Sequence, residues 1–177
     1  MSELRTGHTA DLDAEVLRAA RMLLEDVFGD EWEDHDWEHA LGGVHALIWE
    51  GDTLVGHASV VMRRLLHDGR ALRCGYVEGV AVRADHQRRG HAGVLMEAIE
   101  RVIHGAYDLG ALGGTDEGAP LYLRRGWKLW EGPLFALTPS GVVRTEDADG
   151  AVYVLPVSAP LDLSGELTCD WRGGDVW

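Results

Sequence analysis

The stretch Glu78-Gly-Val-Ala-Val-Arg-Ala-Asp-His-Gln-Arg-Arg-Gly-His-Ala-Gly-Val-Leu95 decides how the rest of the sequence is interpreted. Its first part is apolar and β-branched, as in a buried strand, and its last part begins an amphipathic helix. The turn between them carries Arg83, Arg88 and Arg89. The first N–H groups of a helix have no intrahelical acceptor, and the helix dipole favours an anion there. The pattern therefore predicts a strand–turn–helix unit that docks a pyrophosphate.

The composition fits one globular domain. The chain has 177 residues, of which 46% are apolar and 26% charged, and this is enough for a hydrophobic core. No run approaches the ~20 apolar residues of a membrane span, and the N-terminus lacks a signal-peptide pattern, so we expect a cytoplasmic protein. Cys74 and Cys169 are too few for a disulfide framework or a cysteine-based zinc site. The histidine spacing predicts no metal site either.

The acidic residues are concentrated in two regions of a chain with net charge −14. Residues 22–62 hold ten acids and no lysine or arginine, and eight of those acids lie within 25–38. From residue 143 onward, seven acids stand against two arginines. Such a field repels nucleic acid and attracts small polycations. A charge run alone is more often a solvated surface, so the ligand interpretation depends on where these acids lie.

Hydrophobic periodicity predicts the order of helices and strands. Apolar residues at helical spacing predict one helix capped by Asp11 and ended by Gly29, and another after Gly90. Short helices are expected after a cap at Asp36 and between Thr115 or Asp116 and Gly126. Strands are expected at 44–49, 53–62, 71–82, 107–112, 127–130, 134–137 and 151–155, with a hairpin turn at 67–70 and an irregular tail at 156–177. This order predicts an α+β fold (an α/β sandwich), a mixed central sheet flanked by helices in a single domain over 1–177.

Two motifs resemble those of the GNAT superfamily of acyl-CoA-dependent N-acetyltransferases. The superfamily signature Arg/Gln-x-x-Gly-x-Gly/Ala lies between a central strand and a helix, and here it reads Gln87-Arg-Arg-Gly-His-Ala92. A later signature, Leu-Tyr-x-x-x-Gly-Trp/Phe, reads Leu121-Tyr-Leu-Arg-Arg-Gly-Trp127. Either motif alone is weak, but both in order and in strand–helix settings are fairly specific. The resemblance implies the GNAT acyl-CoA N-acyltransferase fold, acetyl-CoA as cofactor and a homodimer.

Three longer segments are similar to the aminoglycoside 2′-N-acetyltransferases of actinobacteria. They are 36–49, 72–85 and the ending Cys169-Asp-Trp-Arg-Gly-Gly-Asp-Val-Trp177, and the similarity extends over nearly the whole chain. It implies that acetyl is transferred to the 2′-amino group of a polycationic aminoglycoside, which confers resistance. The chain departs from these relatives at Gly113-Gly114, where they offer a hydroxyl, and at Ala148, where they have an acid. The preferred aminoglycoside therefore stays open.

The reaction needs a base for the amine and an acid for the thiolate. Glu78 is the expected general base, acting directly or through one water. Strand alternation would put it on the mostly apolar face of Leu72, Cys74, Tyr76, Val80 and Val82, where burial raises the pKa of a carboxyl. A bulge at Gly79 would break this parity, and an exposed strand glutamate is the alternative. Tyr122, in the tyrosine position of the family, is the expected general acid, although alone it would more often be a core aromatic.

The resemblance also implies the binding residues. The pantetheine arm should pair with Val80, Ala81 and Val82 like an added strand. The pyrophosphate should meet the turn formed by Gln87, Arg88, Arg89, Gly90, His91 and Ala92. Carboxylates suit an amino sugar, and the implied acceptor site consists of Asp30, Glu31, Asp36, Glu78, the Gly79 backbone, Asp175 and Trp177, with the tail 156–177 contributing to it.

Two other interpretations stay open at this point. A GNAT enzyme could act on another amine, such as a polyamine, a cell-wall precursor or a protein N-terminus, and acidic lining suits a polyamine as well. A non-catalytic module could bind acyl-CoA or sequester a cationic antibiotic. The presence of both Glu78 and Tyr122 argues against the second interpretation.

Overall fold

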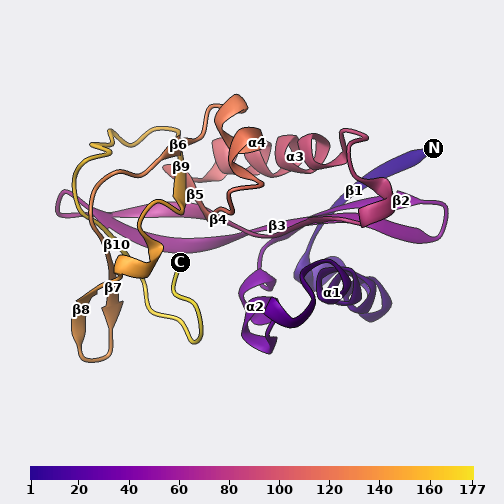
Figure 1. Cartoon of the computed structure of the whole chain (residues 1–177), viewed down its shortest axis with the longest axis horizontal. Coiled ribbons are helices and arrows are strands. Elements are labelled where there is room, and N and C mark those ends of the chain that lie inside the picture. The colour runs from indigo at the N-terminus through magenta and orange to yellow at the C-terminus, as the bar shows by residue number, and fades with distance from the viewer. The chain divides into compact units, whose positions relative to one another are not determined.

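The computed structural model describes residues 1–177, which divide into two compact units. The first unit comprises 1–61 and 77–102, and the second comprises 62–76 and 103–177. Three elements contribute residues to both units: β3 (Thr53–His67), β4 (Arg70–Val82) and α3 (His91–Ala106) (Figure 1). None of the helices has the length and apolar character that crossing a membrane requires.

The first unit contains a three-strand antiparallel ladder that continues into β4. β1 (Ser2–His8) pairs with β2 (Val44–Glu50), and β2 pairs with β3. β2 and the start of β3 were predicted, but β1 was not. The side chains of β1 are almost all exposed, so its sequence lacks the apolar alternation that signals a half-buried strand.

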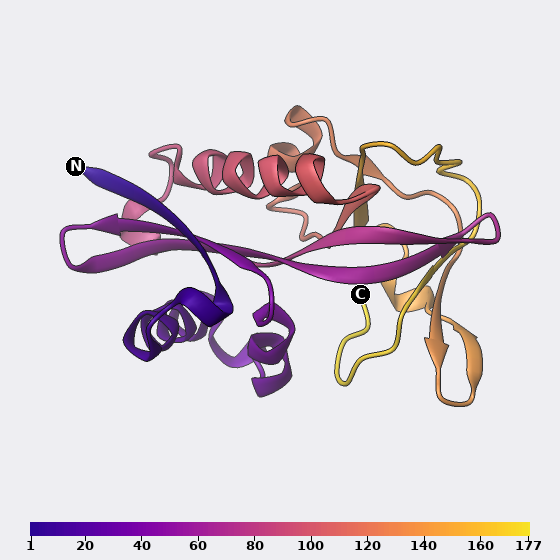
Figure 2. The same cartoon turned by 180° about the vertical axis from the view of Figure 1, so that it is seen from behind.

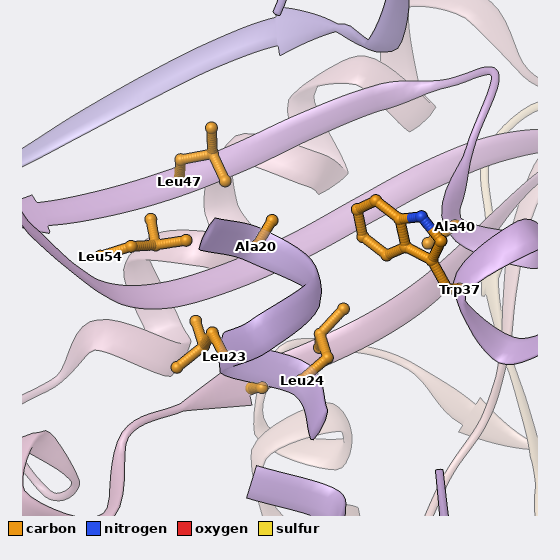
Figure 3. Packing of buried hydrophobic residues seen from close by; sticks show 8 residues of the cluster. Ala20, Leu23, Leu24, Trp37, Ala40, Leu47 and Leu54 are labelled. Atoms are coloured by element: carbon orange, nitrogen blue, oxygen red, sulfur yellow. The ribbon is translucent and has the colours of Figure 1, made fainter. Parts of the chain in front are cut away.

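Helices cover both faces of the sheet in this unit. α1 (Ala14–Phe28) and α2 (Asp34–Ala40) lie on one face, and α3 lies on the other (Figures 1 and 2). α1 ends at Gly29, as predicted, because the φ of +58° there suits glycine. The core under α1 is a cluster of buried side chains: Ala20, Leu23, Leu24, Trp37, Ala40, Leu47, Leu54 and Ala81 (Figure 3). Burial of each large apolar member contributes about 1.5–3 kcal/mol.

Both predicted helix caps in the acidic N-terminal part were wrong. Asp11 belongs to a 3-10 helix, η1 (Thr9–Asp11), and Asp13 is the N-cap of α1. The N-cap of α2 is Glu33, and Asp36 lies one turn further on, where its Oδ2 accepts the Glu33 N–H at 2.9 Å. Several neighbouring carboxylates can satisfy the same N–H groups, so the sequence does not single one out.

The second unit contains the predicted hairpin between β3 and β4. Its turn residues Asp68 and Gly69 both have positive φ, 53° and 72°, as a type I′ turn requires. β4 pairs in parallel with β5 (Leu109–Gly113) over Cys74–Tyr76. β9 (Val152–Pro156) pairs antiparallel with β5, and β6 (Lys128–Leu129) pairs with β9. Parallel and antiparallel pairing together make the sheet mixed, as predicted.

The same unit extends through one strand that the sequence predicted, at 134–137, and two that it did not. β10 (Leu167–Cys169) pairs antiparallel with β3 and parallel with β7 (Leu134–Thr138), which in turn pairs with β8 (Gly141–Arg144). The tail is therefore not irregular throughout, since three of its residues form a strand. α4 (Ala119–Arg124) lies between β5 and β6 in the chain and has Gly118, not Thr115 or Asp116, as its N-cap.

Candidate active site

β4 is interrupted at Gly79, next to the expected base. Gly79 has a φ of +57°, and an added Cβ would lie 3.2 Å from Leu24 Cδ2 and 3.3 Å from His57 Nδ1. Both the conformation and the space therefore require glycine. Beyond this point Ala81 is buried, whereas Val80 and Val82 are half-exposed. The prediction of one continuous apolar face from Leu72 to Val82 was wrong, because Gly79 shifts the alternation.

Glu78 is half-buried at this interruption. Its backbone carbonyl accepts the Ser59 hydroxyl at 3.4 Å, and the carbonyl of Gly79 lies 2.7 Å from His57 Nδ1. Both contacts come from alternate, fully buried residues of β3. Sequence reasoning missed this support, although polar residues at alternate positions in an apolar strand were a signal that it could have used.

The turn after β4 has the conformation expected of an anion site. Arg88 and Gly90 have positive φ values of 60° and 86°, and space is open around an added Cβ at Gly90. α3 begins at His91, and its first helical hydrogen bond runs from the Val94 N–H to the Gly90 carbonyl at 3.2 Å. The N–H groups from His91 onward that precede this bond have no intrahelical acceptor. The turn therefore combines open space with the free N–H groups of a helix start, and the pyrophosphate expected there stays a prediction.

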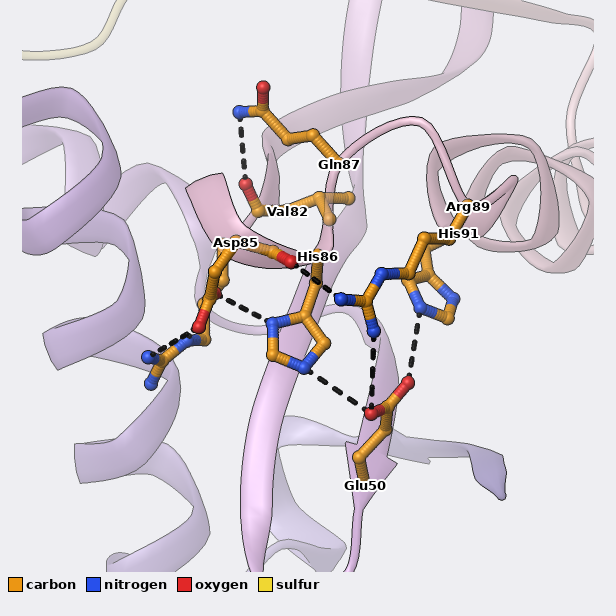
Figure 4. Close-up of polar contacts among 8 residues, drawn as sticks. Glu50, Val82, Asp85, His86, Gln87, Arg89 and His91 are labelled. Atoms are coloured by element: carbon orange, nitrogen blue, oxygen red, sulfur yellow. Dashed lines mark hydrogen bonds and ion pairs between the residues drawn. The ribbon is translucent and has the colours of Figure 1, made fainter.

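The turn is not purely cationic, because Glu50 of β2 lies against it (Figure 4). One Glu50 oxygen lies 3.3 Å from His86 Nε2 and 4.0 Å from Arg89 Nη1, and the other lies 3.4 Å from His91 Nε2. The sequence gives no local signal that Glu50 lies here, since this residue stands 36 positions before His86 in the chain. One carboxylate thus lies within 4.0 Å of three side chains of the turn.

Asp85 is the second carboxylate of the turn. It accepts from Arg83 Nε at 3.2 Å and lies 2.6 Å from His86 Nδ1 (Figure 4). These hydrogen bonds, from Arg83 first and His86 second, lower the pKa of Asp85 to about 2. Its backbone carbonyl also accepts from Arg89 Nη2 at 2.8 Å. Arg83 is thus engaged by Asp85, whereas Arg88 is exposed.

The acidic residues expected at the acceptor site in the first unit follow α1. Asp30 and Glu31 are exposed in the 3-10 helix η2 (Gly29–Glu31). The Asp36 side chain is 26% exposed and lies 3.4 Å from His35 Nε2. Asp34 pairs with Arg21 at 2.5 Å, so the basic residue that precedes this acidic region neutralises part of it. Only Asp36 among the three expected acceptor residues has a defined structural contact of its own.

The second unit contains a pocket of about 730 Å³, within the range of small-molecule sites. Its acidic members are Glu146, Asp147 and Asp175, and Arg144, its one basic member, pairs with Asp149 at 2.6 Å. The lining residues are Gly113, Gly114, Thr115, Arg144, Thr145, Glu146, Asp147, Ala148, Ala151, Val152, Gly174, Asp175, Val176 and Trp177. The pocket therefore brings together Asp175 and Trp177 with Gly113, Gly114 and Ala148.

Trp177 is fixed in this pocket. Its indole N–H donates to Thr145 Oγ1 at 2.8 Å, and its backbone N–H donates to Asp175 Oδ1 at 3.1 Å. The side chain is only 6% exposed. The Asp175 carbonyl in turn accepts from Arg172 Nε at 2.8 Å. The last residues of the chain are therefore an ordered wall of the pocket.

Tyr122 is in α4 and is 8% exposed. Its ring centroid lies 5.8 Å from that of Tyr153 and 6.3 Å from that of Trp127. Burial, together with Tyr153, raises the pKa of Tyr122, so the phenol keeps its proton at neutral pH. An added Cβ at Gly118 would lie 2.8 Å from Tyr122 Cε2, so the N-cap glycine makes room for this ring.

Comparison with known proteins gives consistent matches. Residues 9–130 match a family model described as an acetyltransferase (GNAT) domain. The chain is 51% identical over 177 residues to an aminoglycoside 2′-N-acetyltransferase from Mycolicibacterium fortuitum, and the match covers 98% of this chain and 91% of that protein. Escherichia coli ElaA has a similar fold, with a TM-score of 0.64, 20% identity and coverage of 88% of this chain and 99% of that one. A GNAT family acetyltransferase from Brucella melitensis, in complex with acetyl-CoA, has a TM-score of 0.63, 15% identity and 94% coverage of both chains.

Proposed function

Because this chain belongs to the GNAT acetyltransferase family, we propose that it transfers acetyl from acetyl-CoA to the 2′-amino group of aminoglycosides. The observation that carries this proposal is the 51% identity, over nearly the whole chain, to an aminoglycoside 2′-N-acetyltransferase. The acidic pocket of the second unit supports it, because aminoglycosides carry several ammonium groups. Each charge-assisted hydrogen bond to a carboxylate contributes about 1.5–3 kcal/mol. Resistance to the modified antibiotic would follow.

Acetyl-CoA is the acyl donor of this family, and when bound it supplies an acetyl group activated as a thioester. We assign its pantetheine arm to the backbone of Val80, Ala81 and Val82, which extend β4 past the residues that pair with β5. The pyrophosphate is assigned to the turn, whose members are Gln87, Arg88, Arg89, Gly90, His91 and Ala92. The open space at Gly90 and the unpaired N–H groups at the start of α3 support this assignment.

Glu78 is the proposed general base and Tyr122 the proposed general acid. Glu78 takes the proton of the acceptor ammonium, directly or through one water, so that the amine has a free electron pair. The amine attacks the thioester carbon, so that a C–N bond forms as the C–S bond breaks. Tyr122 donates a proton to the leaving thiolate and regains one from the nitrogen, which loses its second proton as the amide forms. The raised pKa of the Tyr122 phenol keeps its proton available until then. The half-buried position of Glu78 supports its role, since it combines access with partial shielding.

The residues that we propose for acceptor binding are, in the first unit, Asp30, Glu31, Asp36, Glu78 and the Gly79 backbone. In the second unit they are Asp175 and Trp177. We propose that the whole chain acts as one catalytic domain in the cytoplasm, where acetyl-CoA is available. A homodimer is part of the proposal. Leu137, Val142 and Val143 on β7 and β8 are exposed apolar side chains that a second copy would cover.

An acceptor panel tests the proposed function. Pairs of aminoglycosides that differ only in a 2′-amino or 2′-hydroxyl group, together with polyamines and peptide amines, are mixed with enzyme and acetyl-CoA, and thiol release is measured. Only the 2′-amino members should be turned over rapidly. Equal turnover of both members of a pair rejects the 2′ assignment, and turnover of polyamines alone supports the other acceptor class. Absence of thiol release with every amine would leave only a binding module.

Asp175→Asn should raise the KM for the aminoglycoside about tenfold, because the variant loses one charge-assisted hydrogen bond of about 1.5–3 kcal/mol and 1.4 kcal/mol is a factor of ten. The amide oxygen can still accept the Trp177 N–H that Asp175 Oδ1 accepts, so the wall of the pocket is kept. The KM for acetyl-CoA should stay within about twofold. Steady-state kinetics with each substrate varied in turn measures both constants.

Asp162→Asn is the matched control for this variant. Asp162 is an exposed acid of the same tail whose Oδ1 accepts the Ser164 N–H at 3.0 Å, so the exchange makes the same charge change outside the pocket. Both KM values should stay at the wild-type level in this control. A rise of the aminoglycoside KM in both variants would mean that overall charge, and not Asp175, governs acceptor binding.

A further inference from the structure

A chain of hydrogen bonds inside the first unit ends on the carbonyl of Gly79. Thr9 Oγ1 lies 2.8 Å from His45 Nε2, and His45 Nδ1 lies 3.0 Å from His57 Nε2. His57 Nδ1 then lies 2.7 Å from the Gly79 oxygen. Both histidines are 0% exposed. These hydrogen bonds thus link Thr9, in the first turn after β1, to Gly79, the residue that follows the proposed base Glu78.

The donor and acceptor in each of these hydrogen bonds can be assigned by starting from the Gly79 carbonyl. A carbonyl oxygen only accepts, so His57 Nδ1 carries the proton and donates it. A neutral imidazole has one N–H, so His57 Nε2 accepts from His45 Nδ1, and His45 Nε2 accepts from the Thr9 hydroxyl. Thr9 Oγ1 itself accepts the Gly42 N–H at 2.9 Å. The hydroxyl has one proton, and His45 Nε2 at 2.8 Å is a closer acceptor for it than the Gly43 carbonyl at 3.3 Å. The bonds from the Gly42 N–H onward therefore all point towards Gly79.

Both rings stay neutral at physiological pH. Burial lowers the pKa of His57 to about 3, against the opposing effect of its bond to Gly79. Burial and the nearby His8 lower the pKa of His45 to about 4. Two polar rings in a protein core are unfavourable unless their hydrogen bonds are made. Apolar side chains would fill the same space without this requirement, so the pair indicates a task other than packing.

The hydrogen bond from His57 to Gly79, which ends this series, restricts the backbone around Glu78. His57 holds the Gly79 carbonyl, and Ser59, two residues along β3, holds the Glu78 carbonyl. Leu24 and His57 close the space over the Gly79 Cα, which has a φ of +57°. With both carbonyls fixed, the peptide planes on either side of Gly79 are fixed, and so is the direction in which the Glu78 side chain leaves the backbone.

We propose that His57, oriented by His45, is a positioning residue that holds the turn at Gly79 and thereby aims the Glu78 carboxylate at the acceptor amine. This inference rests on the role of Glu78 in the proposed function. It assigns no proton transfer to either histidine, since a backbone carbonyl cannot pass a proton on. Loss of the hydrogen bond should therefore lower kcat and leave the affinity for acetyl-CoA unchanged.

A double-mutant cycle of His57→Phe and Glu78→Gln tests the coupling. His57→Phe should lower kcat about 10- to 100-fold, as expected of a misplaced catalytic group, with the KM for acetyl-CoA within about twofold of wild type. In the Glu78→Gln background the same change should cost less than about twofold, because no base is left to position. Equal losses in both backgrounds would overturn the inference, since a general structural defect lowers every rate alike.

A conservative variant and a spectroscopic measurement complete the test. His57→Asn keeps an N–H close to the position of Nδ1 and should recover most of the kcat that His57→Phe loses. In the wild-type protein, ¹⁵N chemical shifts should show His57 protonated at Nδ1 alone between pH 6 and 8. The opposite tautomer overturns the inference even if His57→Phe does not fold.

The test separates this inference from the proposed function. The cycle uses whichever amine the wild-type enzyme acetylates fastest, so failure of the aminoglycoside assignment leaves the coupling measurable. If Glu78→Gln retains wild-type kcat, the role of Glu78 fails and this inference fails with it. If no amine is acetylated, the tautomer and the hydrogen bond are still decided by the ¹⁵N spectrum, but a catalytic positioning role is rejected.

Discussion

Glu78→Gln should lower kcat about 100- to 10,000-fold, the range that a positioned general base contributes. Glutamine has nearly the shape of glutamate but cannot accept the proton of the acceptor ammonium. Packing around Gly79 should be preserved, because His57 and Ser59 hold this segment through the backbone carbonyls of Gly79 and Glu78. The KM for acetyl-CoA should therefore change little. Thiol release at saturating concentrations of both substrates measures the effect.

Glu97→Gln provides the control for that variant. Glu97 is an exposed glutamate of α3, so its exchange makes the same chemical change on a solvated surface and should leave kcat at the wild-type level. Thermal unfolding of both variants shows that each is folded. A Glu78→Gln enzyme with at least half of the wild-type kcat would remove Glu78 as the base and leave the acceptor amine to lose its proton to solvent.

The parts of the fold that the sequence predicted are those with a local signal. The apolar stripe of α1, its end at Gly29 and the Asp68-Gly69 turn each follow from residues within a few positions of one another. β1, β8 and β10 have no such signal, because the exposed face of β1 and the three residues of β10 acquire their strand geometry from their partners. Pairing of this kind depends on residues far away in the chain.

In the candidate site, too, the features that could be predicted are those with a local signal in the sequence. The conformation of the turn 87–92 could be predicted, since its glycine, arginines and helix start are adjacent in sequence. That Glu50 lies against the turn could not be predicted, because β2 brings it there from 36 positions before His86. The left-handed φ of Gly79 was not predicted as such, because a bulge at Gly79 was considered only as the case that would break the strand alternation. A glycine inside a strand pattern permits a break without requiring one, and here the contacts of Leu24 and His57 decide it.

The buried histidines have a consequence for stability: acidification from pH 8 to pH 5 should lower the free energy of unfolding by about 4 kcal/mol. Folding lowers the pKa of His45 to about 4 and of His57 to about 3, from an ordinary value of 6.5. Between these values the unfolded chain binds protons that the folded chain excludes, so stability is complete above about pH 6.5 and falls below it. At pH 5 each histidine contributes about 2 kcal/mol to the loss, at 1.36 kcal/mol per pH unit.

Urea unfolding followed by tryptophan fluorescence at several pH values measures this loss of stability. The pH at which stability is lost shows whether histidines or carboxylates cause it. The carboxylate of Asp85, whose pKa is lowered to about 2, contributes stability that is lost only below the ordinary pKa of aspartate, about 3.9. The interval from pH 8 to pH 5 therefore isolates histidines. The double variant His45→Gln/His57→Asn should lose most of the pH dependence, whereas His104→Gln, an exposed residue of α3, should retain it. If the double variant keeps the full dependence, the protons are taken up elsewhere, and the assignment of His45 and His57 as an enclosed neutral pair is wrong.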